Sequence, residues 1–161
     1  MGGTRKLIEP WRTQVLELLA SIREKSAFLD TVRAETLCTI LDDMADQAEK
    51  AVREERKGRP IEDDADTLKA LIGAKTKSWR NDLVLTLEQW MQDLVRLKVA
   101  EGQTLNLNFP EQETVLRARS DAYTLARLLE NLTMLEQLTV HLERNISPAQ
   151  VLPYWMDRFY L

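Results

Sequence analysis

An apolar stripe that runs from Leu68 to about Val99 constrains this chain more than any other feature. Its members, apolar apart from one lysine, are Leu68, Leu71, Ile72, Lys75, Trp79, Leu83, Leu87, Trp90, Met91, Leu94 and Leu97. They recur every three or four residues, which is the spacing that places side chains on one face of an α-helix. At 1.5 Å per residue such a helix is roughly 50 Å long. The stripe therefore predicts one long helix, with Gly73 as the point at which a kink would form.

Shorter stripes of the same period precede it. Pro10 suits the first turn of a helix, where its missing N–H leaves no bond unmade, and this helix fades near Lys25. Ser26 can cap a second helix, whose apolar phase shifts near Arg33, so we expect a bend or a short break there. Gly58 ends that helix. The apolar positions are Trp11, Val15, Leu18, Leu19 and Ile22 in the first helix, and Phe28, Leu29, Val32, Leu37, Ile40, Leu41, Met44, Ala48 and Val52 in the second.

The segment after the long helix predicts a loop and a short helix. We expect the loop to place Leu107 and Phe109 in the core, because the two side chains alternate with polar residues. A short helix should then run from Glu111 to about Ser120. No internal repeat of solenoid length is evident.

A leucine-rich helix is predicted over residues 122–143, with Asp121 as its cap. Its apolar positions are Leu125, Leu128, Leu129, Leu132, Leu135, Leu138 and Leu142. Met134 and Val140 widen that face, so we expect this helix to be covered on more than one side.

Composition agrees with a fold made only of helices. Of the 161 residues, 44% are hydrophobic and 30% are charged, and only five glycines and five prolines interrupt the chain. Good helix formers dominate. We expect an all-α bundle of about five to seven helices with one long central helix, in a single domain over residues 1–161. The start Met1-Gly2-Gly3 resembles an expression tag. We therefore interpret residues 1–8 as tag-derived or disordered, and the chain as a C-terminal fragment of a longer protein.

One cysteine and one histidine exclude a disulfide framework and a Cys/His zinc site. A lone thiol fits the reducing cytoplasm. No apolar run approaches the ~18 residues that a membrane span needs, and the first residues lack the apolar core of a signal peptide. We expect a cytoplasmic protein that does not enter a membrane.

Charge argues against direct nucleic-acid binding. The net charge is −4, and residues 1–80 carry 15 basic and 15 acidic side chains, so the deficit lies in residues 81–161, with 7 and 11. No long basic stripe could neutralise a run of phosphates. The one locally basic patch comprises Lys69, Lys75, Lys77 and Arg80. We interpret it as the solvated side of the long helix.

No pattern of catalytic or cofactor-binding residues is evident. The glycines, at positions 2, 3, 58, 73 and 102, form no phosphate-binding Gly-Lys-Ser/Thr sequence. Cys38 has apolar neighbours and is interpreted as a small core residue, and His141 as a histidine packed at the rim of the core. The acidic residues Glu62, Asp63, Asp64 and Asp66 lack the Gly and Glu of an EF-hand loop and instead suit the first turn of a helix. We expect no catalysis, cofactor, metal ion or small-molecule substrate.

The final helix carries the aromatic residues that we expect at a partner interface. Ser147 can cap this helix and Pro148 can occupy its first position. Trp155, Phe159 and Tyr160 lie at its end, and aromatic side chains supply much of the binding energy at protein interfaces. Burial in the core is the alternative for each of them. The candidate partner-facing residues are therefore Trp155, Phe159 and Tyr160.

Three stretches carry a resemblance to a known family. Trp90-Met91-Gln92-Asp93-Leu94-Val95 resembles the Trp-x-x-Asp-Leu-Leu element in the C-terminal helical collar domain of bacterial DNA polymerase III clamp-loader subunits, delta-prime above all. The leucine-rich stretch over residues 125–138 is also similar. Residues 142–148 are similar to the family's Leu-x-x-Asn-x-Asn-Pro turn, in which Asn145 would be a turn or cap residue. The resemblance covers about half of the chain.

The resemblance implies a function that involves no chemistry in this domain. The collar holds a ring of five subunits together while ATPase modules load a sliding clamp during DNA replication. The expected partners are the other clamp-loader subunits, and an ATPase-type module would precede this domain in the parent protein. An alternative of a different class is a free-standing helical adaptor that binds one partner through its C-terminal helix.

Overall fold

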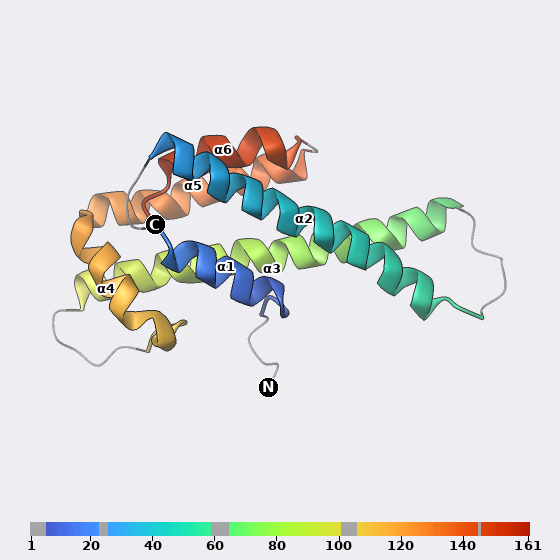
Figure 1. Ribbon diagram of the computed structural model, residues 1–161, viewed down its shortest axis with the longest axis horizontal. Helices are drawn as coiled ribbons and strands as arrows, with labels where there is room; N and C mark the ends of the chain where they lie inside the picture. The colour runs from blue at the N-terminus through green and yellow to red at the C-terminus, as the bar shows by residue number, and fades with distance from the viewer. Residues whose placement is uncertain (1–5, 23–25, 59–64, 101–105, 145) are drawn as a thin grey trace.

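The computed structural model describes residues 6–22, 26–58, 65–100, 106–144 and 146–161. Six α-helices and one 3₁₀ helix follow one another (Figure 1): α1 (Trp11–Ala20), α2 (Ala27–Glu55), α3 (Ala65–Val99), η1 (Pro110–Gln112), α4 (Glu113–Ala122), α5 (Leu125–Glu143) and α6 (Pro148–Arg158). Helices account for 83% of the described residues, which form no strand, so the all-α prediction is confirmed. The predicted positions of Glu62, Asp63, Asp64 and Asn145 lie outside the described residues.

Four helices form the bundle. α2 packs against α3 and α6, and α5 packs against the same two helices. α1 contacts α2, and α4 packs on α3 near the end of the molecule where α5 begins (Figure 1). The end of α2 and the start of α3 run antiparallel and extend beyond α5 and α6 (Figure 1). We call residues 44–55 and 65–80, the end of α2 and the start of α3, the hairpin.

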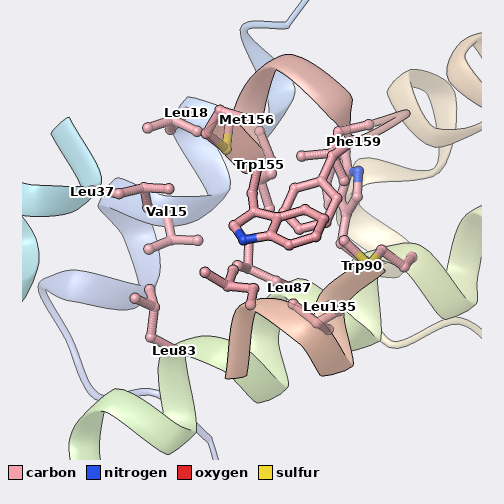
Figure 2. Packing of buried hydrophobic residues seen from close by; sticks show 14 of the residues in the cluster. Val15, Leu18, Leu37, Leu83, Leu87, Trp90, Leu135, Trp155, Met156 and Phe159 are labelled. Atoms are coloured by element: carbon pink, nitrogen blue, oxygen red, sulfur yellow. The ribbon is translucent and has the colours of Figure 1, made fainter. Parts of the chain in front are cut away.

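The core gathers around the second part of α3. Its buried apolar side chains are Leu83, Leu87, Trp90, Met91 and Leu94. Figure 2 shows Leu87 and Trp90 close to Trp155 and Phe159 of the C-terminal segment. α3 runs without a break through Gly73, because a single glycine costs a helix only about 1 kcal/mol.

A buried carboxylate fastens the loop after α3 to the side of that helix. Asp93 is fully buried. Its Oδ1 accepts hydrogen bonds from the backbone N–H of Asn108 at 2.9 Å, from Asn108 Nδ2 at 3.1 Å and from Arg96 Nη1 at 3.2 Å. Its Oδ2 accepts the backbone N–H of Phe109 at 2.9 Å. The charge is thus stabilised by four donors, as a buried carboxylate requires.

This loop places Leu107 and Phe109 in the core, as predicted. It leads directly into η1 and α4. α4 is fastened in turn to α3, because Ser120 Oγ donates to the backbone carbonyl of Leu94 at 3.1 Å. Two buried polar contacts therefore hold the connection between α3 and α5.

The expected short break near Arg33 is absent, because α2 is continuous from Ala27 to Glu55. The shift in apolar phase has a different cause. Phe28, Leu29 and Val32 point outward and are exposed. Asp30 and Arg33 face inward instead, and the two side chains form a buried ion pair at 3.1 Å. The apolar phase therefore shifts because Phe28, Leu29 and Val32 point outward, and not because the helix breaks.

Helix starts were only partly predicted. Asp121 lies within α4 and does not cap α5. Thr124 caps it instead, since its Oγ1 accepts the backbone N–H of Arg127 at 3.3 Å. Ser147 and Pro148 occupy the predicted N-cap and first positions of α6, although the Ser147 side chain makes no capping bond.

The expectation that α5 is covered on more than one side is wrong for the isolated chain. Met134 is buried as predicted, but Leu125, Leu129 and Val140 are exposed, the last two at 47% and 42%. The bundle supplies neighbours for one side of α5 only, from α3 and α6.

The interpretation of residues 1–8 also requires a correction. Leu7 is buried and belongs to the core, because it is an apolar residue directly ahead of α1. Leu7 is therefore an ordered part of the fold. Residues 1–5 lie outside the described part of the chain.

Replacing Asp93 tests whether its carboxylate fastens the loop. Asp93→Ala leaves the N–H groups of Asn108 and Phe109 without their acceptor. Since an unsatisfied buried donor costs about 1–3 kcal/mol, we expect the free energy of unfolding to fall by about 3–5 kcal/mol. Urea unfolding followed by circular dichroism measures the change. Asp46→Ala, at an exposed position of α2, is the control, and an equal effect of the two substitutions would contradict the assigned role.

Candidate functional site

Two of the three candidate partner-facing residues lie in the core of the chain. Trp155 is 3% exposed and Phe159 is 1% exposed, and Figure 2 shows both surrounded by buried residues of other helices. The indole Nε1 of Trp155 donates to His141 Nδ1 at 3.2 Å. The prediction that Trp155 and Phe159 face a partner is therefore wrong. They are buried because α6 packs between α2 and α5, which sequence spacing alone does not reveal.

Tyr160, the third candidate, is half-buried. Its backbone is held by Asn131, a fully buried residue of α5. Asn131 Nδ2 donates to the carbonyl of Tyr160 at 2.7 Å, and Asn131 Oδ1 accepts the N–H of Tyr160 at 2.8 Å. The Tyr160 ring lies edge-on to Tyr123, with centroids 5.3 Å apart, and the guanidinium of Arg127 lies over it. Asn131 thus fastens the C-terminal residues to α5. No sequence pattern predicted this role of Asn131.

Phe159→Ala separates a core role from an interface role. Truncating a fully buried phenylalanine costs about 3–5 kcal/mol of stability. Phe28→Ala is the matched control, because Phe28 is 76% exposed, and its effect should stay within about 0.5 kcal/mol. Urea unfolding of the two variants and the wild type measures both changes. A small effect of Phe159→Ala would restore the partner-facing interpretation.

The potentially reactive side chains form no metal-binding cluster in the residues that the structure describes. No group of three His, Cys, Asp or Glu side chains among them could hold a metal ion. Cys38 is partly buried, and the pKa of its thiol is raised by this burial and by the nearby carboxylates of Asp42 and Glu35. Burial is also the main cause that raises the pKa of the Tyr123 hydroxyl. Both groups therefore stay protonated at neutral pH.

The raised pKa of Cys38 predicts slow alkylation. Because the thiolate is the reactive species, a higher pKa leaves less of it at any given pH. We expect iodoacetamide to modify the folded chain more slowly than the urea-unfolded chain at the same pH. The midpoint of its pH dependence should also lie higher in the folded chain. Mass spectrometry of timed samples measures both rates, and equal midpoints would contradict the raised pKa.

The four members of the basic patch on α3 have different surroundings in the fold. Lys75 Nζ lies 2.7 Å from Glu55 of α2 and 5.6 Å from the centroid of the Trp79 ring. Lys69 and Lys77 are exposed, and Arg80 is half-buried. One member thus ties α3 to α2. The two exposed lysines agree with a solvated side.

An apolar surface that the bundle leaves largely uncovered lies along α5. We define the α5 stripe as Leu125, Leu129, Leu132 and Val140, of which Leu132 is half-buried and the others are exposed. Intervals of four, three and eight residues place these side chains on one side of the helix. The buried residues of α5 form a different side, which comprises Leu128, Asn131, Met134, Leu135, Leu138 and Leu142.

Acidic residues continue the α5 stripe. Glu136 lies four residues after Leu132, and Glu143 lies seven residues after Glu136, so both carboxylates share the side of the stripe. Both are exposed. The surface therefore combines apolar contact area with negative charge, and it matches a partner surface that is apolar with a basic border.

In the part of the chain that the structure describes, no helix has the length and apolar character needed to cross a membrane. Comparison with protein-family models, with curated proteins and with solved structures returned no match.

Proposed function

We propose that this chain is a non-catalytic oligomerisation domain of the kind that forms the helical collar of bacterial DNA polymerase III clamp loaders. It would hold neighbouring subunits together in the cytoplasm while separate ATPase modules load the sliding clamp for DNA replication. Delta-prime is the subunit that the chain resembles most. In the parent protein, an ATPase-type module would precede this domain.

One observation carries the proposal. The leucine-rich helix of the resemblance has two apolar sides, and the chain's own bundle covers only one of them. Leaving large aliphatic side chains in water forgoes about 25 cal/mol for each Å² that a partner would cover. An uncovered apolar stripe on a well-packed helix is therefore typical of a helix that packs against another subunit.

The other stretches of the resemblance support a scaffold role. Trp90 and Leu94 are fully buried in the core. Asp93, between them, fastens the loop that leads to α4. These three residues therefore position helices. The element would orient α5 and its stripe relative to the rest of the bundle.

The adaptor alternative relied on aromatic residues of the C-terminal helix. Trp155 and Phe159 now belong to the core, so these side chains cannot provide its docking surface. Tyr154 is the large side chain that α6 exposes, and it is stacked by Arg158, whose guanidinium carbon lies 3.4 Å from the ring centroid. No observation favours α6 over α5 as the contact element.

Association with clamp-loader subunits tests the proposal. We expect the chain to co-elute with the other subunits of a bacterial clamp loader in size-exclusion chromatography with light scattering. Leu129→Glu and Val140→Glu together should weaken this association at least tenfold, because truncated or charged hot-spot positions cost about 2 kcal/mol or more.

Leu71→Glu is the matched control, because Leu71 is a 38% exposed leucine on the hairpin, away from α5. It should leave association unchanged. Failure of the wild type to associate, or equal losses in the control, would contradict the proposal. If the chain instead forms a dimer with itself through α5, the partner would be a second copy of the chain and not another subunit.

A further inference from the structure

A polar hollow of about 270 Å³ lies beside the loop that Asp93 fastens. Four parts of the chain surround it: the segment before α1, α1 itself, the second part of α3 and the loop at residues 106–109. Its apolar floor consists of Leu7, Leu107 and Phe109, which are all buried. The walls are polar, and they come from residues far apart in the sequence.

Three cations converge on this hollow. Lys6 comes from the segment before α1, Arg12 from α1 and Arg96 from α3. The side chains of Thr86, Gln89, Asn106 and Asn108 complete the polar lining, and no carboxylate lines the hollow among the described residues. Convergence of positive charge from separate elements in a concave site favours an anionic ligand.

Both guanidinium groups keep hydrogen-bond donors for a ligand. Arg96 uses Nη1 toward Asp93, and Arg12 uses Nη2 toward Glu111 at 3.3 Å. Since a guanidinium has five N–H donors, each retains others. Phe109 packs under Arg12, whose guanidinium carbon lies 5.6 Å from the ring centroid, so this side chain is held in place. The two arginines are thus oriented before a ligand arrives.

The charge of Asp93 does not close the site to anions. Its two oxygens already accept from two backbone N–H groups, one amide and Arg96. It is buried behind the loop rather than lining the hollow. Glu111 holds one side of Arg12 and is half-exposed at the border.

We propose that this hollow binds a diphosphate group. Guanidinium groups pair with phosphate oxygens through two parallel N–H bonds. A hollow of about 270 Å³ is many times larger than a site for one water molecule, so it has room for two linked phosphates. Free pyrophosphate and the terminal phosphates of a nucleoside diphosphate share this chemistry. The site is separate from the α5 stripe and does not depend on the proposed collar function.

Calorimetric titration of the whole chain with pyrophosphate and with ADP, at constant ionic strength in chloride, tests the proposal. We expect saturable binding of at least one of the two. Tighter binding of pyrophosphate identifies the free ion as the source, and tighter binding of ADP identifies a nucleotide. Amide resonances of residues 106–109 should shift during the titration with the ligand that binds.

Two variants and a control locate the site. Arg96→Gln should weaken binding at least about tenfold, because a hydrogen bond between charged groups is lost. Lys6→Gln should weaken binding about threefold, and Lys6 is exposed, so this variant leaves the fold intact. Arg53→Gln is matched to Arg96→Gln, since Arg53 also pairs within its own helix, with Glu49 at 2.9 Å, but on the hairpin. Absence of saturable binding, or an equal loss in Arg53→Gln and Lys6→Gln, would overturn the proposal.

Discussion

The carboxylate of Asp93 holds the loop after α3 against the side of that helix, and the positions of α4 and α5 follow from this contact. A reversal of chain direction normally exposes its backbone N–H groups to water. Here, a fully buried acceptor satisfies two of them and lets Phe109 enter the core beside Trp90. Ser120, near the end of α4, makes a second contact of this kind, because its hydroxyl donates to the backbone carbonyl of Leu94 in α3. α3 thus serves both as the centre of the core and as the support of the connection that returns to it.

Most helices could be predicted because helical periodicity is local. The stripe from Leu68 to Val99 and the pairing of Ser147 with Pro148 each depend on residues a few positions apart. The structure confirms the long helix and the start of α6, although the Ser147 side chain makes no capping bond. Burial of Trp155 and Phe159 depends on α2, more than a hundred residues away in the sequence, so no local pattern could reveal it. The same limit explains the uncovered side of α5, because a stripe shows that a helix side is apolar and not which neighbour covers it.

The two proposed surfaces differ in their physics. The α5 stripe offers aliphatic area with acidic residues along it, which favours another helix with a basic border. The hollow beside Arg96 offers directed cations over an apolar floor, which favours a small anion. The net charge of −4 agrees with a basic partner for the α5 stripe, since the acidic excess lies in the half of the chain that contains α5. The hollow is locally basic although the net charge of the chain is negative.

The hairpin gives α3 two parts with different stability. Residues 65–80 include no buried side chain, whereas the buried residues of α3 begin at Asp82. The first part contacts α2 and, through Trp79, the ring of Trp11 in α1, whereas the second part is surrounded by the whole core. We therefore expect local opening to cost less at the start of α3 and to approach the free energy of global unfolding in its second part. By this expectation, one unbroken helix would open in two cooperative units.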